Sequence, residues 1–444
     1  MLTNNKTLYT MNWKEEYKRK VSTPAKAIKD IHDGQCVVMG HAAAAPRVIQ
    51  QELANHCEDY NDVLIFHMTT LGDNPCYKPR CFGHFRHVSN FLSANSRDVV
   101  ERREGDFFPA YFKDVPAMIG TDIPCDVAVF QATPPNEEGY CSLGVSCDYA
   151  KAAIRAAKTV IIETNELMPF TYGDTLVHIS QMDHIIPCAY HLQELLLPSA
   201  GEVEMAIGRN CASLIADGST LQLGIGAIPD AVLAALGDKN DLGIHSEMIS
   251  NGIIDLVKRG NINGSRKTLH KGKVVVTFIM GSRELYEFVD GNQDVEFHPV
   301  DYVNNPLVVA KNDRMISINS CLEVDLQGQV ASETIGIRQY SGIGGQVDFI
   351  RGASLAREGK AIIAMRSTAA GGKISRIKPF LTEGAAVSTS RNDVDYIATE
   401  YGIARLKGRT LQHRAEDLIH IAHPDFRPEL IEEYEKRFKC KYQE

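Results

Sequence analysis

A single acidic residue, Glu247, stands where an apolar run passes into a polar, glycine-containing turn, in the sequence LGIHSEMISNG of residues 242–252. A carboxylate that leaves an apolar strand is partly desolvated, which makes it more basic and more nucleophilic. Glycine clusters at 224–226 and 342–345 can bring backbone N–H groups near it. A carboxylate among such donors is suited to attack an acyl carbon while the resulting oxyanion is stabilised. On this segment alone, an ordinary surface carboxylate at the end of a strand stays open as the alternative.

The upstream cluster, Gly224, Ile225 and Gly226, follows a short strand and precedes a helix that begins near Pro229. N–H groups at such a turn can bind phosphate or stabilise an oxyanion. The pattern also approaches a dinucleotide fingerprint, with Glu247 as an acidic residue about 20 positions on. However, Pro229 occupies the place of the third glycine. The open interpretations are a structural turn, an acyl or phosphate cradle, and a nicotinamide site.

The downstream cluster, Gly342, Ile343, Gly344 and Gly345, is denser in glycine and lies outside any strand pattern. Glycine permits positive φ angles and a close approach of the backbone to a ligand, although a tight structural turn is an equal alternative. His41 also ends a strand, at the sheet edge where α/β sites gather. A lone histidine in such a place is more often a structural hydrogen-bonding residue than a catalyst.

Cysteine and histidine residues crowd one short segment, from Cys76 through Cys81 and His84 to His87. Structural zinc sites normally use paired CxxC or HxxxH-type spacings, which this segment lacks. We therefore expect no metal site there.

The composition of the chain argues against a nucleic-acid-binding, membrane or secreted protein. The net charge of -9 and the pI near 5.9 argue against nucleic acid as the main partner, because phosphate neutralisation needs a basic surface. No apolar run approaches the ~18 residues of a membrane-spanning helix, so no membrane partner is expected. The polar start, residues 1–6, lacks the apolar core of a signal peptide. With 11 scattered cysteines interpreted as reduced thiols, the sequence predicts a cytoplasmic protein.

Short β-branched runs alternate with helical patterns, which predicts an α/β fold with parallel or mixed sheets and flanking helices. Residues 315–320, 323–326 and 329–330 are predicted as antiparallel strands with a tight turn at Gln327–Gly328. The break at 195–201 divides the chain into predicted domains 1–195 and 196–444. The other predicted elements are strands at 36–39, 126–130, 158–162, 220–223, 274–279, 361–365 and 385–388, a crossover helix at 149–157 and a charged helix within 428–444.

Several longer motifs, taken together and in order, resemble the CoA-transferases of the acetyl-CoA hydrolase/transferase family. They extend over nearly the whole chain from Met11 onward, in the segments 134–146, 222–230, 243–252, 341–349, 388–396 and 399–402. The resemblance implies two CoA-transferase-type α/β domains, of which the second carries the catalytic glutamate. It implies ping-pong transfer of CoA between acetyl-CoA and a short-chain carboxylic acid, with 4-hydroxybutyrate favoured, or butyrate. It also implies a homodimer and no cofactor, because coenzyme A is itself a substrate.

The same resemblance assigns roles to individual residues. Glu247 becomes a glutamyl-CoA thioester, and Gly344 and Gly345, with the 224–226 turn, form the acyl site and the oxyanion hole. Asn251 stands where close relatives often carry Asp, a mild departure from the pattern. The residues expected to contact CoA or the acid are His41, Gln222, Asn251, Gly342 and Ile343.

Three other functions stay open. An acyl-CoA hydrolase would use the same glutamate and let water intercept the intermediate. A non-catalytic CoA-binding regulator could share the fold, although the intact Glu247 and both glycine clusters argue against it. A nicotinamide-dependent dehydrogenase is the last alternative.

Overall fold

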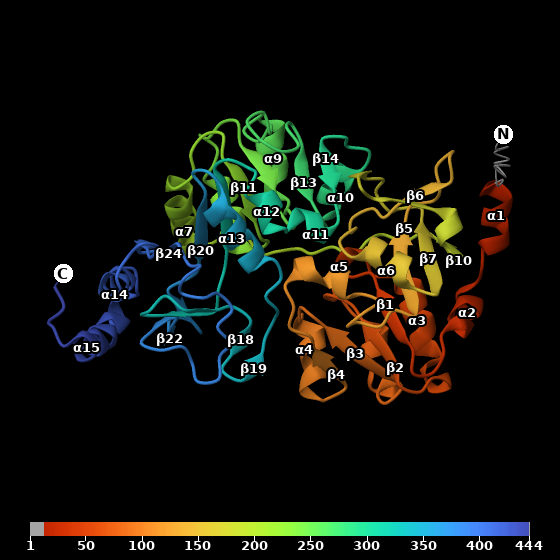
Figure 1. The fold of residues 1–444 in the computed structure, drawn as a ribbon, viewed down its shortest axis with the longest axis horizontal. Helices are drawn as coiled ribbons and strands as arrows, with labels where there is room; N and C mark the ends of the chain where they lie inside the picture. Colours follow the sequence, from red (N-terminus) through yellow and green to blue (C-terminus); the bar gives the residue numbers. More distant parts are fainter. Residues whose placement is uncertain (1–12, 444) are drawn as a thin grey trace, which may run out of the picture.

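The computed structural model describes residues 13–443, so the polar N-terminal stretch and Met11, where the resemblance begins, lie outside the described residues. Within this range the chain builds two large sheets, one mainly from each half (Figure 1). The N-terminal half lies to the right in that view and the C-terminal half to the left. Helices α14 (Leu411–His420) and α15 (Arg427–Phe438) form the far end of the C-terminal half.

Seven parallel strands form the first sheet of the described chain. Strand β5 is buried at every position, as expected for a strand that is covered on both faces. In sheet order the strands are β10 (His184–Cys188), β7 (Thr159–Asn165), β5 (Val127–Ala132), β1 (Cys36–Met39), β2 (Val63–Phe66), β3 (Phe85–Ser89) and β4 (Gly105–Phe107).

Nine strands form the second sheet in the described range, all parallel except the last pair, β24 and β25. This sheet is therefore mixed, and the first is parallel, within the predicted range of parallel or mixed sheets. In sheet order the strands are β25 (Gly402–Arg405), β24 (Tyr396–Thr399), β20 (Lys360–Ala364), β15 (Met315–Asn319), β11 (Thr220–Leu223), β12 (Gly243–His245), β13 (Val274–Val276), β14 (Val295–Phe297) and β8 (Tyr172–Gly173).

Helices cover both faces of the sheets because successive strand side chains point to opposite sides. In the second sheet, Ile362 lies in the same core as Ile207 of α7 (Glu202–Ser213), whereas its neighbour Ile363 lies in the same core as Phe349 of α13 (Gln346–Leu355). The remaining helices are α1 (Trp13–Lys20), α2 (Pro24–Ala27), α3 (Arg47–Asn55), α4 (Ala94–Glu101), α5 (Val115–Met118), α6 (Ala150–Ala156), α7 (Glu202–Ser213), α8 (Ala227–Ala234), α9 (Gly252–Lys258), α10 (Arg283–Val289), α11 (Val300–Val303), α12 (Pro306–Val309) and α13 (Gln346–Leu355).

Two strand predictions are wrong. Residues 315–320, predicted as an antiparallel strand, contain β15 in the middle of the parallel sheet, where Ile316 and Ile318 face one apolar core and Met315 the other. Residues 385–388 form no strand, because this short run follows a turn at Gly384 and leaves Val387 half exposed.

The other predicted elements are confirmed within a few residues at their ends. The tight turn joins β16 (Glu323–Asp325) to β17 (Val330–Ala331), with Gly328 at a φ of 84°. The short strands outside the main sheets are β6 (Tyr140–Ser142), β9 (Leu176–His178), β18 (Thr334–Ile335), β19 (Arg338–Gln339), β21 (Thr368–Ala369), β22 (Ile374–Ser375) and β23 (Ile377–Lys378).

The two halves are joined by shared structure. Strand β8 belongs to the first half in sequence but pairs with β14 at the edge of the second sheet. Ser146 makes an isolated bridge to Phe278, and one apolar core holds residues from both halves, such as Phe112 and Phe278. The predicted boundary at 195/196 falls in the irregular segment between β10 and α7, and it stays a prediction.

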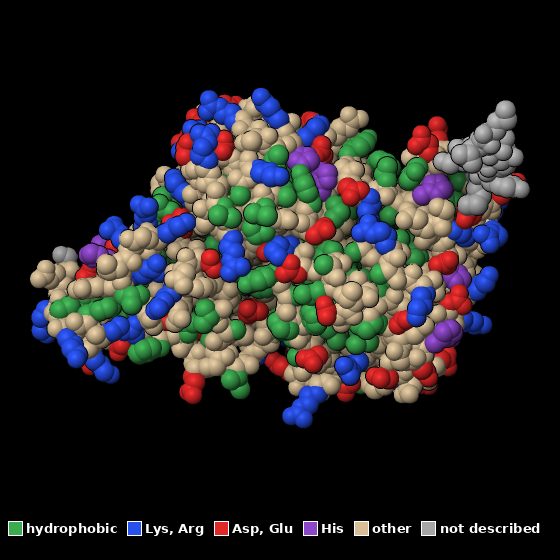
Figure 2. Space-filling view, in the orientation of Figure 1, with side chains coloured by type: hydrophobic (Ala, Val, Ile, Leu, Met, Phe, Trp, Pro, Cys, Tyr) green, Lys and Arg blue, Asp and Glu red, His purple; other side chains and the backbone are tan. Residues whose placement is uncertain are grey.

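The visible surface carries basic and acidic side chains interspersed, without a large area of one sign (Figure 2). Among residues 13–443, no helix combines the length and the apolar character needed to span a bilayer.

Candidate active site

Glu247 lies just beyond β12, held by the ends of three adjacent strands. Its backbone carbonyl accepts hydrogen bonds from the N–H groups of Thr277 and Phe278, at 3.0 and 3.3 Å, just after β13. The preceding Ser246 donates its hydroxyl to the carbonyl of Leu223, at 3.1 Å, where β11 ends. Glu247 and the turn at 224–226 therefore leave the sheet side by side, at the carboxyl edge where α/β sites gather.

The carboxylate of Glu247 is half-buried and faces the second glycine cluster. Its Oε2 accepts a hydrogen bond from the side-chain amide of Asn304, at 2.7 Å. A Cβ atom at Gly345 would overlap both Glu247 Oε2 and Asn304 Nδ2, and one at Gly344 would lie 3.8 Å from Oε1. Only a glycine backbone can approach a carboxylate so closely. The fold thus brings together three residues, Glu247, Asn304 and Gly345, that are spread over nearly 100 positions of the sequence.

The environment makes this carboxylate unusually basic. Burial raises the pKa of Glu247 from 4.5 to about 7, and the hydrogen bond from Asn304, the charge of His41 and the Gly345 backbone offset only part of that effect. The negative charge of Asp148 acts in the raising direction. Above neutral pH the group is therefore an ionised, poorly solvated carboxylate, which is a reactive oxygen nucleophile.

The glycine loop of the second half rests on the first half. The N–H of Phe112 donates to the carbonyl of Gly344 at 3.2 Å, and the guanidinium of Arg97 donates to the carbonyl of Tyr340 at 2.9 Å. A Cβ atom at Gly342 would overlap the carbonyl oxygen of Asn90. The site therefore lies at the junction of the two halves, and Gly342 serves in part to seat the loop, whereas the predicted substrate contact of Ile343 stays a prediction.

His41, at the end of β1, is buried and already paired. Its Nε2 lies 2.9 Å from Asp148 Oδ2, and its ring stacks on Tyr149 and meets the edge of Phe278, with centroids 5.5 and 4.9 Å away. Burial alone would raise the pKa of Asp148, but His41 and the hydrogen bonds from Ser146 and the Tyr149 N–H bring it below its usual value. His41 thus reaches Glu247 through its charge, and its predicted contact with substrate stays a prediction.

Buried polar groups with unused hydrogen-bonding capacity surround the site. Within the described chain, the Nδ1 of His41, both amide atoms of Asn90, the Oδ1 of Asn304 and the Oδ2 of Asp348 have no partner. Burial raises the pKa of Asp348 to about 8, with a further contribution from the charge of Glu247. Buried polar groups are normally satisfied, so these atoms are available to bond water or a ligand at the site.

The other predicted contact residues have protein partners. Gln222 and Asn319 exchange two side-chain hydrogen bonds, at 3.2 and 3.1 Å, across the ends of β11 and β15. The Oδ1 of Asn251 accepts from the N–H of Ser282 at 3.0 Å, which joins the start of α9 to the loop before α10. By contrast, a Cβ atom at Gly224 or Gly226 would meet no atom within 4 Å, so the 224–226 turn borders open space.

The cysteine and histidine residues of the 76–87 segment are bonded separately to backbone carbonyls. Cys76 Sγ donates to Gln50 and Cys81 Sγ to Ala54, while a ring nitrogen of His84 bonds the carbonyl of Tyr60 and one of His87 that of Cys76. These separate hydrogen bonds indicate that the segment has a structural role.

Asn304, Asp148 and Asp348 were not foreseen from the sequence. Asn304 lies 57 positions from its partner Glu247, at the end of the four-residue helix α11, and no motif marks it. Asp348 follows directly on the predicted glycine cluster, so its position near that loop was the one available signal.

The raised pKa of Glu247 predicts a pH-dependent stability effect. A carboxyl group whose pKa is raised by folding stabilises the protein at low pH, and this contribution is lost as the pH rises through about 7. Glu247→Gln should therefore be more stable than the parent at pH 8, by up to about 3 kcal/mol, with the difference shrinking toward pH 5. Urea unfolding at both pH values measures this, with exposed Glu58→Gln as the control. Equal destabilisation at both pH values would contradict the assignment.

Two family models match the chain. The acetyl-CoA hydrolase/transferase N-terminal domain matches residues 5–189, and the C-terminal domain of the same family matches residues 281–434. Glu247 lies between the two matched ranges. The predicted fold of two CoA-transferase-type α/β domains is confirmed.

Proteins similar to this chain over nearly their whole length include several CoA-transferases. The 4-hydroxybutyrate coenzyme A transferase of Clostridium kluyveri is 54% identical over 429 residues, covering 96% of this chain and 100% of the relative. The butyryl-CoA:acetate CoA-transferase of Anaerostipes caccae is 34% identical over 446 residues, covering 96% and 98%. The crystal structure of a 4-hydroxybutyrate CoA-transferase from Porphyromonas gingivalis has a TM-score of 0.84 at 47% identity, covering 96% and 100%. RipA from Yersinia pestis has a TM-score of 0.92 at 36% identity, covering 97% and 100%. This chain therefore belongs to the acetyl-CoA hydrolase/transferase family of enzymes.

Proposed function

We propose that this member of the family is a CoA-transferase, which moves CoA between acetyl-CoA and a short-chain carboxylic acid through a thioester on Glu247. The observation that carries the proposal is the setting of the Glu247 carboxylate. It has a pKa of about 7, is aimed by Asn304 at 2.7 Å, and is packed against the Gly344–Gly345 backbone. A basic, held carboxylate beside close backbone is the arrangement that acyl transfer to an oxygen nucleophile requires.

In the first half-reaction, an ionised oxygen of Glu247 attacks the thioester carbonyl of acetyl-CoA. The tetrahedral oxyanion collapses to a mixed acetyl–glutamyl anhydride, and the C–S bond breaks to release CoA thiolate. The thiolate then attacks the glutamyl carbonyl, which forms the glutamyl-CoA thioester and releases acetate. No proton has to be removed from the nucleophile, because it reacts as the carboxylate.

The second half-reaction runs the same steps with another acid. Its carboxylate attacks the glutamyl thioester, giving a new mixed anhydride and CoA thiolate. The thiolate attacks the acyl carbonyl of the incoming acid, so that the new acyl-CoA leaves and Glu247 returns as a carboxylate. Each tetrahedral intermediate carries an oxyanion, for which we propose donors from the 344–345 loop and the 224–226 turn. One such donor typically contributes ~3 kcal/mol.

For the acid, we propose 4-hydroxybutyrate in preference to butyrate. The support is the identity to the Clostridium kluyveri and Porphyromonas gingivalis transferases named for 4-hydroxybutyrate, which exceeds that to the butyryl-CoA:acetate enzyme. Gln222 is engaged by Asn319, and His41 is engaged by Asp148 through Nε2 although its Nδ1 has no partner. Asn90 and Asp348, which lie on or beside the loop at 342–345 and have unused bonding capacity, are our first candidates to bind a terminal hydroxyl, with His41 Nδ1 as a further one. A site that hydrogen-bonds a hydroxyl rejects an analogue that lacks it.

Two more features belong to the proposal. The 11 free cysteines, most of them buried, are consistent with a cytoplasmic location, where thiols stay reduced. We also propose a homodimer on the basis of the family.

The covalent step can be tested by trapping. Incubation with acetyl-CoA followed by borohydride or hydroxylamine should modify Glu247, and peptide mass spectrometry should locate the change there. Glu247→Ala should lower transfer by more than about 10⁴-fold, because the residue that carries CoA is lost. The same trapping on Glu166→Ala, which removes a glutamate away from the site, should leave the adduct intact. Modification elsewhere, or full activity of Glu247→Ala, would refute the assignment.

A panel of acids separates the open functions. With acetyl-CoA as donor, 4-hydroxybutyrate should give the highest kcat/KM, and Asn90→Ala should reduce the preference over butyrate by about 10-fold or more, because an unpaired hydroxyl is then left in the site. Release of free CoA without any acid at the rate of transfer would instead indicate a hydrolase. Binding of acetyl-CoA without turnover for any acid would indicate a regulator, and binding of NAD(H) in calorimetry would revive the dehydrogenase.

The close approach at Gly345 predicts a specific defect. In Gly345→Ala the added methyl overlaps Glu247 Oε2 and Asn304 Nδ2, so the carboxylate must move away from its attack position. A displacement of about 1 Å typically lowers the rate ~100-fold, and we expect kcat to fall by that amount with a smaller change in KM. Gly237→Ala is the matched control, since its Cβ meets no atom within 4 Å. Unchanged kcat in Gly345→Ala would show that the loop is not part of the catalytic geometry.

A further inference from the structure

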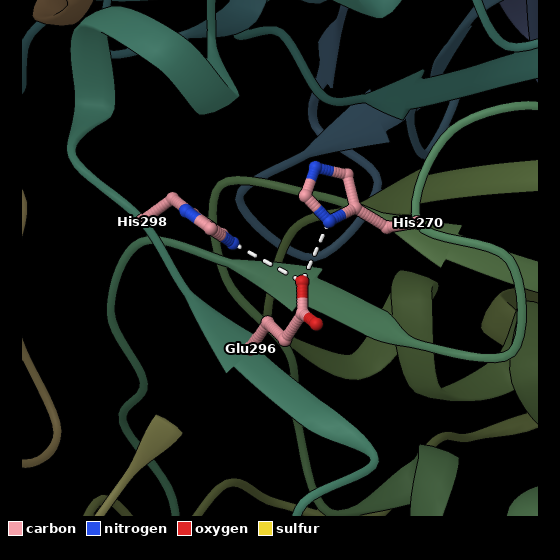
Figure 3. A group of neighbouring side chains, drawn as sticks. All are labelled: His270, Glu296 and His298. Carbon is pink, nitrogen blue, oxygen red and sulfur yellow. Dashed lines mark hydrogen bonds and ion pairs between the residues drawn. The ribbon is translucent and has the colours of Figure 1, made fainter. Parts of the chain in front are cut away.

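Two histidines and a glutamate converge away from Glu247, on the same half of the molecule. Their potential ligand atoms all lie within 4.8 Å of one another, and within residues 13–443 this is the one such group of three or more His, Cys, Asp or Glu side chains. Figure 3 shows the imidazoles of His270 and His298 pointing at the carboxylate of Glu296 from two sides. His270 Nδ1 and His298 Nε2 lie 2.6 and 3.2 Å from the same oxygen, Glu296 Oε2.

One of these residues lies in a strand, a second follows directly after that strand, and the third has an unusual backbone conformation. Glu296 lies in β14 and His298 two positions later, so their side chains leave the strand on the same face. His270 lies in the loop between α9 and β13 at a φ of 49°, a conformation rare outside glycine. Such strained positions persist where the surroundings over-determine them, and they are frequent at functional sites.

A fourth residue orients the first histidine. The hydroxyl of Tyr302, in α11, lies 2.7 Å from His270 Nε2, the ring nitrogen that faces away from Glu296. Histidines that bind metals almost always use the second ring nitrogen in such a hydrogen bond, which fixes the ring and its tautomer. His298 and Tyr302 also line a surface cavity of about 310 Å³, which gives the cluster access to solvent.

We propose that His270, Glu296 and His298 form a binding site for a divalent transition metal ion. Two imidazoles and one carboxylate suit such ions, and three protein ligands leave positions for water from the neighbouring cavity. With bonds of about 2.0–2.2 Å, the three ligand atoms need a separation of about 3.3 Å. The 2.6 and 3.2 Å separations from Glu296 Oε2 differ from that value by under about 1 Å, and the two histidine nitrogens lie within 4.8 Å of each other, so small side-chain rotations bring all three atoms to an ion that replaces the bridging protons.

Hydrogen bonding alone explains the cluster less completely. A carboxylate oxygen can accept two hydrogen bonds, but both histidines converge on the one oxygen Glu296 Oε2, whereas in another histidine–carboxylate pair of the described chain, His184 with Asp30 at 2.7 Å, a single histidine is used. The ion would tie the 264–273 loop to β14 and, through Tyr302, to α11. Its place is structural, since no step at Glu247 passes through it, and it does not depend on the proposed function. It also departs from the sequence expectation of no metal, because residues 26 and 2 positions apart form no recognisable motif.

Direct titration tests the proposal. The purified full-length chain, freed of metal by dialysis against a chelator, should bind one Zn²⁺ per chain in calorimetry and give a visible absorption spectrum with Co²⁺. His298→Ala should weaken Zn²⁺ binding by more than about 100-fold, and Tyr302→Phe by about 10-fold or more, because the ring loses its orienting partner. His184→Ala, which removes a paired histidine elsewhere, should bind as the parent does.

The metal-binding measurements can support or overturn the proposed site. Saturable one-to-one binding that His298→Ala abolishes and His184→Ala retains supports the site. If His298→Ala fails to fold, Tyr302→Phe and the Co²⁺ spectrum of the parent chain carry the test. No saturable binding to the parent chain, or equal binding in all variants, would overturn the proposal.

Discussion

The candidate site depends on one constraint: the carboxylate of Glu247 is shielded from water and forms no salt bridge with a Lys or Arg side chain in the described chain. Desolvation destabilises the charge of Glu247, and the amide of Asn304 and the glycine backbone return only part of the lost hydration. In the proposed function, this uncompensated loss of hydration is what makes the oxygen reactive, since a fully solvated or salt-bridged glutamate would be a weak nucleophile. Stability and reactivity are therefore opposed at this residue, as is common where a protein keeps an active group under-satisfied.

The architecture around Glu247 follows from this constraint. A residue that must be half-buried and still reachable fits the carboxyl edge of a parallel sheet, where strands end and backbone N–H groups turn outward. The fold places the ends of β11, β12 and β13 around the residue, and a loop from beyond β19 closes on it from the side. That loop is in turn fastened to Phe112 and Asn90 of the other half. The site is therefore assembled by tertiary packing.

Local patterns predicted those parts of the structure whose physics is local. Continuous apolar runs identified buried parallel strands such as β1 and β11 almost to the residue, and the glycines at 344–345 were recognisable because few other residues allow such an approach. The prediction failed at β15, where an apolar run followed by a true hairpin was taken as part of that hairpin. Neither the contact of Asn304 with Glu247 nor the His270–Glu296–His298 cluster could be predicted, because only long-range folding brings these residues together.

The pairing of β8 with β14 has a consequence for how the chain can be divided. A two-residue strand contributed by the first half caps the rim of a sheet that otherwise belongs to the second. Without it, β14 would present unpaired N–H and C=O groups, the kind of open border that recruits other chains into aggregates. The halves are thus not autonomous modules, although each has its own sheet. A segment of the first half protects the edge strand of the second half's sheet from pairing with other chains.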